Sequence, residues 1–165
     1  MRTKLGSNTK KEAKKRIGTS LEFDRLRAKV RRKFNKFIQL RDLIKTPSGK
    51  IIAHCISCER EKIIESSYQL KEFHAGHYFK EDRHESVALD EINVNGQCGR
   101  CNRYLNGNES AYEENLRIKY GDEEFENLRY RKNQIKKYSY GELQELDRIY
   151  SQKIKDEQKR LGQKW

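Results

Sequence analysis

The chain has 165 residues, of which 34% are hydrophobic and 38% are charged, and its formal net charge is +12. This length allows one modest domain with appendages, and the small supply of apolar residues favours a folded centre that a metal ion helps to hold together. No apolar run approaches the roughly 20 residues that span a bilayer, and no signal peptide is visible. We therefore expect a cytoplasmic protein that does not associate with membranes.

The positive charge is confined to one part of the chain. Residues 1–50 contain 17 Lys and Arg against 4 Asp and Glu, whereas residues 51–165 contain 20 against 21. A basic excess in one segment is typical of a surface that contacts nucleic-acid phosphates. The alternative is a charge-rich helix that only faces solvent.

The N-terminal region divides into two parts. Residues 1–19 are basic and have too few apolar residues to bury, which predicts a tail that is disordered until it meets a polyanion. Residues 20–46 read as a basic amphipathic helix, with Ser20 as the N-cap and an end near Ile44, because Pro47 disfavours helix just before it. Its apolar stripe could pack on the central domain or on a second copy of the chain. Its opposite face carries the candidate DNA-binding residues Arg25, Lys29, Arg32, Lys33 and Lys36.

Residues 47–121 form the predicted central region, and residues 122–165 the C-terminal helices. A short strand is expected at 51–52, a second at 68–77 and a third at 92–94. Helices are expected at 102–105 and from Asn108 or Ser110 to Tyr120, where Gly121 ends the second. A helix beginning at Asp122 should turn Phe125, Leu128 and Ile135 inward, and a long helix should run from Ser139 to Gly162.

All four cysteines lie in the central region as two C-x-x-C pairs, Cys55 with Cys58 and Cys98 with Cys101. In a reducing compartment such paired spacing predicts a tetrahedral zinc site with four thiolate ligands. A closed site of this kind leaves no open position for a substrate. The zinc is therefore expected to be structural, and any catalytic metal must bind elsewhere.

Four motifs together resemble the phage lambda NinG (Rap) family of recombination endonucleases, within the HNH or His-Me finger nucleases. These motifs are Cys55-Ile56-Ser57-Cys58, Ala75-Gly76-His77-Tyr78, Gln97-Cys98-x-x-Cys101-Asn102 and Gly107-Asn108. The similarity covers roughly residues 51–130, about half of the chain. It implies an α+β fold: a small ββα finger on a treble-clef-like zinc site, flanked by N-terminal and C-terminal helices.

The resemblance also implies roles for individual residues. It makes His77 the general base, Asn93 the residue that orients it, and Asn102 a ligand of a catalytic Mg²⁺ or Mn²⁺. The HNH pattern places a metal-binding Asp or His directly before the base, and this chain has Gly76 there. His74 is one candidate for the missing ligand. Asp90 is another.

The remaining expectations concern the substrate. Arg100 and Arg103 flank the last cysteine and are candidate phosphate contacts. The resemblance implies cleavage of branched recombination intermediates such as Holliday junctions, a homodimer that makes two symmetric cuts, and a phage or prophage origin in a bacterial host cell. Two alternatives stay open: a non-catalytic zinc-stabilised DNA-binding module, and an HNH nuclease that acts on linear duplex DNA.

Overall fold

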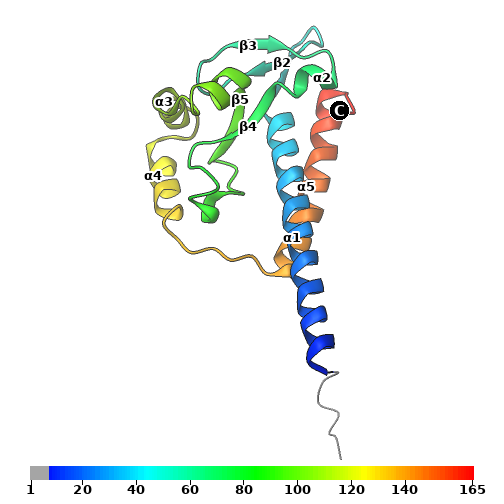
Figure 1. The fold of residues 1–165 in the computed structure, drawn as a ribbon. Helices are drawn as coiled ribbons and strands as arrows, with labels where there is room; N and C mark the ends of the chain where they lie inside the picture. The colour runs from blue at the N-terminus through cyan, green and yellow to red at the C-terminus, as the bar shows by residue number, and fades with distance from the viewer. Residues whose placement is uncertain (1–7) are drawn as a thin grey trace, which may run out of the picture.

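The computed structural model describes the backbone of residues 8–165 and the side chains of residues 20–165. The fold is α+β, with a three-stranded sheet of order β1-β2-β3, a two-stranded sheet β4-β5, and helices on both sides (Figure 1). The strands are β1 Leu43–Lys45, β2 Ile51–His54, β3 Glu61–Ile63, β4 Phe73–His77 and β5 Val94–Cys98. The helices are α1 Asn8–Arg41, α2 Ser67–Leu70, α3 Glu109–Tyr120, α4 Asp122–Arg131 and α5 Tyr140–Leu161, with short turns η1 Glu85–Val87 and η2 Arg100–Tyr104.

The two long helices, α1 and α5, run side by side in the same direction (Figure 1). The apolar stripe of α1 packs within the chain: Val30, Phe34 and Ile38 are fully buried in a cluster that includes Leu143 and Tyr150 of α5 and Val94 of β5. The sequence left open whether the stripe packs on the central domain or on a second copy of the chain. In the structure it packs on the central domain and on α5. In Figure 1, the N-terminal part of α1 extends beyond the start of α5.

Both predicted ends of the first helix were wrong. Helix α1 begins at Asn8, well before Ser20, so the part of the predicted disordered tail from residue 8 onward is helical, and residues 1–7 lie outside the described residues. Residues 10–16 are all Lys, Arg, Glu or Ala, which have high helix propensity, and no Pro precedes Ser20 to stop the helix. At the other end α1 stops at Arg41, because Leu43–Lys45 pairs with β2 as strand β1.

The strands match the predicted alternation only in part. The strand predicted for residues 68–77 begins at Phe73, and the preceding residues form the short helix α2, whose N-cap Ser66 accepts a hydrogen bond from the Gln69 amide. The returning strand β5 is longer than predicted and starts at Val94. Strands β4 and β5 are antiparallel with Gly76 opposite Asn95.

The C-terminal helices agree with the sequence except at one residue. Gly121, with φ of 85°, separates α3 from α4, and Ser139 forms a capping box with Glu142 at the start of α5. Phe125 and Leu128 are buried as predicted. Ile135 is 90% exposed because α4 ends at Arg131 and leaves it in the linker to α5. No helix within residues 8–165 is both long and apolar enough to cross a bilayer.

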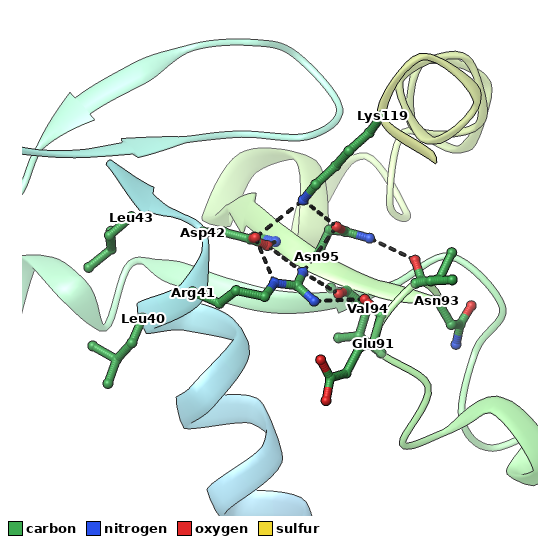
Figure 2. A network of polar contacts seen from close by, with 12 residues as sticks. Leu40, Arg41, Asp42, Leu43, Glu91, Asn93, Val94, Asn95 and Lys119 are labelled. Carbon is green, nitrogen blue, oxygen red and sulfur yellow. Dashed lines mark hydrogen bonds and ion pairs between the residues drawn. The ribbon is translucent and has the colours of Figure 1, made fainter. Parts of the chain in front are cut away.

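A polar network joins the end of α1 to β5 and α3 (Figure 2). The Asp42 carboxylate accepts hydrogen bonds from the Arg41 guanidinium at 2.9 Å, the Gly96 amide at 2.7 Å and the Lys119 ammonium at 3.2 Å. Arg41 also donates to the carbonyl of Val94 at 2.9 Å. Burial alone would raise the pKa of Asp42, but Arg41, Lys119 and the Gly96 amide outweigh it and lower the pKa below its usual value.

We predict that Asp42→Asn destabilises the fold by about 2–4 kcal/mol, because the largely buried Arg41 guanidinium would keep its charge without the carboxylate. Since the pKa of Asp42 is lowered on folding, its stabilisation is complete above about pH 4 and disappears as the pH falls through the lowered pKa. Urea unfolding followed by circular dichroism at several pH values measures both effects.

Asp24→Asn is the matched control, because Asp24 is exposed on α1 and should tolerate the same change. If the two variants unfold at the same urea concentration, the Asp42 network does not stabilise the fold in the way described.

Candidate functional site

The four cysteines converge at one point in the structure. Cys55 and Cys58 lie in the turn between β2 and β3, Cys98 ends β5, and Cys101 lies in η2. Their sulfur atoms all lie within 4.8 Å of one another, and the Cys58 and Cys98 sulfurs are 3.8 Å apart. Zn–S bonds of about 2.3 Å in a tetrahedron require sulfur separations of about 3.8 Å. The four cysteines are thus positioned to bind a metal ion, and this ligand set suits structural zinc.

His77 lies at the end of β4, and its side chain is only 13% exposed. Its Nε2 atom is 3.0 Å from the carbonyl oxygen of Ala88, and the Glu81 carboxylate is 3.9 Å away. Burial lowers the pKa of His77 below its ordinary value, and the Ala88 carbonyl and Glu81 oppose this only partly. The imidazole is therefore neutral at neutral pH. With Nε2 donating its proton to Ala88, Nδ1 is left as the acceptor nitrogen.

His77 and Asn102 line the same cavity, which has a volume of about 360 Å³. Asn102 reaches it from η2, directly after the zinc-site residue Cys101. The carboxylate residues Glu81 and Asp82 also line it. Within the described side chains, the Asn102 amide makes no hydrogen bond, so its oxygen is available to a ligand. The cavity thus combines a neutral imidazole with several hard oxygen donors.

Asn93 is fully buried and does not contact the His77 ring. Its side chain accepts from the amide of Phe79 at 2.8 Å and donates to the carbonyls of Phe79 at 3.0 Å and Val87 at 2.9 Å. These bonds fix the backbone two residues after His77 and the residue before Ala88. Asn93 can therefore position the histidine through the surrounding loop.

His74 lies outside this cavity. Side chains alternate along β4, so His74 and Gly76 face one side of the strand, whereas Ala75 and His77 face the cavity on the other. The His74 Nε2 atom is buried without a hydrogen-bond partner among the described residues. At position 76, a Cβ atom would overlap the side-chain amide of Gln97. The buried Gln97 therefore explains why glycine stands where the HNH pattern has a metal ligand.

The other candidate ligand, Asp90, is also occupied elsewhere. One of its carboxylate oxygens pairs with Arg131 at 2.8 Å, and the other accepts from the amide of Ile92 at 2.9 Å. The predictions from the sequence did not include the acidic residues that do line the cavity, Glu81 and Asp82. Their position four and five residues after His77 was the available signal.

The predicted DNA-binding residues fall into three groups. Lys29 and Lys33 pair with Asp147 of α5 at 2.9 and 2.6 Å and so hold the two long helices together. Lys36 is half-buried, and burial lowers its pKa. The exposed residues that form no ion pair among the described side chains are Arg25, Arg32, Arg100 and Arg103.

A family model described as Bacteriophage Lambda NinG protein matches residues 2–160. The chain belongs to this family. Membership suggests a role related to phage recombination and supports a phage-family origin. The match extends well beyond the motifs that carried the resemblance and includes most of α1 and α5. No curated protein and no solved structure matches the chain.

We predict that this NinG-family protein, purified without added metal, contains about one zinc ion per chain, and that removing the ion unfolds the central region. Elemental analysis and circular dichroism before and after chelation measure these two properties. Cys101→Ser should lose the zinc, because a neutral hydroxyl replaces a thiolate ligand. His54→Ala should keep it, since His54 adjoins Cys55 but is not among the clustered ligands. Zinc-free protein with an unchanged fold would refute a structural zinc site.

Proposed function

We propose that the chain is a metal-dependent DNA endonuclease of the HNH type that cleaves branched recombination intermediates. The observation that carries this proposal is that His77 and Asn102 line the same cavity. Strand β4 positions His77, and η2, which contains the zinc-site residue Cys101, positions Asn102. A module that only bound DNA would not need a neutral, partly buried histidine opposite a free amide and two carboxylates.

His77 is suited to the role of general base. Its Nε2 proton is directed to the Ala88 carbonyl, so Nδ1 takes a proton from the attacking water. The lowered pKa keeps the imidazole in its basic form at neutral pH. The Ala88 carbonyl and Glu81 then stabilise the imidazolium that forms. Asn93, which fixes the backbone on both sides of this arrangement, acts as a positioning residue.

The oxygen donors of the cavity suit a divalent cation. An amide oxygen from Asn102 and a carboxylate from Asp82 are hard ligands of the kind that Mg²⁺ and Mn²⁺ prefer. Within residues 20–165 the cysteines are the only cluster of three or more His, Cys, Asp or Glu that suits a metal. This agrees with Mg²⁺, which is usually held by one or two protein ligands together with waters and substrate phosphates. When bound, the cation would offset charge on the phosphate and the leaving oxygen.

The substrate preference rests on family membership together with charge. The exposed Arg25 and Arg32 on α1 and Arg100 and Arg103 beside Asn102 are available for phosphates. Resolution of a four-way junction requires two symmetric cuts, so we expect two copies of the chain to act together. Since the apolar stripe of α1 is buried against α5 and β5, the contact between copies must use another surface.

We predict that His77→Ala lowers cleavage of a synthetic four-way junction by at least about 100-fold, the usual lower contribution of a positioned general base. Junction binding should persist, because the phosphate contacts come from other residues. Gel-based cleavage and binding assays with Mg²⁺ measure both, and a linear duplex of the same sequence tests the preference for branches. His54→Ala is the matched control.

Cleavage at the wild-type rate by His77→Ala would exclude this histidine as the base. If wild-type protein binds DNA but cleaves none of these substrates, a non-catalytic DNA-binding module is the better reading. Equal cleavage of junction and linear duplex would instead favour a nuclease of broader specificity.

We predict that Asn102→Ala and Asp82→Asn each lower cleavage, and that raising the Mg²⁺ or Mn²⁺ concentration partly restores it, because the first change removes a metal ligand and the second replaces a charged ligand with a neutral one. His74→Ala should retain near wild-type activity, since His74 faces the other side of β4. Cleavage rates measured over a range of metal concentrations test all three variants. A metal-dependent defect in His74→Ala would show that His74 supplies a ligand after all.

A further inference from the structure

A second concave surface lies beside the proposed catalytic cavity. It is a groove of about 540 Å³ formed by α1, the loop around η1 and the linker between α4 and α5. The groove walls are fixed to one another: the Ser86 hydroxyl donates to the Lys132 carbonyl at 3.0 Å, and Arg27 of α1 pairs with Glu85. The groove is therefore a built feature of the fold, formed by three segments far apart in the sequence.

The groove is strongly basic. Its lining contains five Lys or Arg residues and one acidic residue, Glu85, which already pairs with Arg27. Arg83, Lys132 and Lys137 form no ion pair with any described side chain. They come from two of the three walls, so an anionic chain that lay in the groove would meet positive charge on more than one side.

The groove also presents apolar surface. Ile135 is 90% exposed, and Tyr138 lies in the same wall with the Lys136 ammonium 5.0 Å from the centre of its ring. An exposed apolar side chain and a partly buried aromatic ring beside unpaired cations are a combination that suits single-stranded nucleic acid, in which phosphates meet the charges and bases contact the apolar surface. In duplex DNA the base faces are buried in the stack, and an acidic peptide has no comparable flat apolar faces.

The groove and the catalytic cavity lie on either side of a smaller hollow. This hollow contains Phe79 and shares Arg83 and His84 with the groove and Lys80 with the cavity. On α1, Phe23 and Arg27 line the groove, and Asn35 lines the cavity further along the same helix. The span from Phe23 to Asn35 is about 18 Å at the rise of an α-helix.

We infer that this groove binds an unpaired DNA strand that continues from the cleavage site. The inference rests on the proposed nuclease function for the direction of the strand, but binding itself requires no catalysis. A branched substrate presents unpaired or splayed nucleotides next to duplex, and the groove would select for them.

The test is a fluorescence anisotropy titration of a labelled oligothymidylate of about a dozen nucleotides, within the length range typical of single-strand sites. It uses the full-length zinc-containing protein without added Mg²⁺ or Mn²⁺, so that an absence of cleavage does not affect the result. Ile135→Ser should weaken single-strand binding by about threefold or more while leaving binding to a blunt duplex unchanged. Arg83→Ala with Lys137→Ala should make the dependence of log K on log salt shallower by about 0.7 for each lost phosphate contact.

Two substitutions serve as matched controls. Ile118 on α3 is 74% exposed and does not line the groove, so Ile118→Ser should not alter binding, and Lys62→Ala on β3 is the control for charge. Equal effects of Ile118→Ser and Ile135→Ser would overturn the inference. Competition experiments give a second way to overturn it. The inference is wrong if an acidic peptide or single-stranded RNA displaces the labelled oligothymidylate at lower concentrations than unlabelled oligothymidylate does. Normal single-strand binding by a His77→Ala protein that no longer cleaves would support it.

Discussion

The convergence of four thiolates is the constraint on which the proposed site depends. Two of them come from the turn between β2 and β3, and two from the end of β5 and from η2. A metal ion bound by all four would fix η2 against the β4-β5 sheet, and η2 carries Asn102 to the cavity that His77 also lines. Without the metal, four thiols within 4.8 Å would have little to hold them there, and this small core offers few substitutes.

Hydrogen bonds among buried polar residues also hold the helices against β5. The Asn95 side-chain oxygen accepts from Lys119 at 2.8 Å and from Tyr120 at 2.9 Å, which ties α3 to β5, while Asp42 ties β5 to the end of α1. Gln97 donates to the Gly107 carbonyl at 2.7 Å across the back of the sheet. Because alternate residues of β5 are polar and buried, this strand acts as a polar hub between helices. The apolar contacts lie mostly in the α1-α5 pair and beneath β2.

The parts of the fold that the sequence predicted are those with local signals. The paired C-x-x-C spacing, the Gly121 break and the start of a long helix at Ser139 each specify structure within a few residues, and each is found in the structure. Other differences from the predictions come from long-range packing. Nothing local in Leu43–Lys45 distinguishes the last turn of a helix from a strand, because pairing with β2 decides it. His74 seemed a plausible ligand by spacing, but its partner strand places it on the opposite face, and the large Gln97 side chain removes any room beside Gly76.

Not all of the positive charge of α1 is available for binding DNA, because several of its basic residues form ion pairs within the chain. One face of this helix uses Lys29 and Lys33 to hold Asp147 of α5. Another uses Arg27 and Arg31 to hold Glu85 and Glu81 in the loop that frames the proposed cavity and groove. These partly exposed ion pairs are individually weak, so a phosphate could replace a carboxylate in them at small cost. If DNA binds as proposed, the arginines that pair with these loop carboxylates are placed to pair with phosphates instead, which would couple DNA binding to the position of Glu81 beside His77.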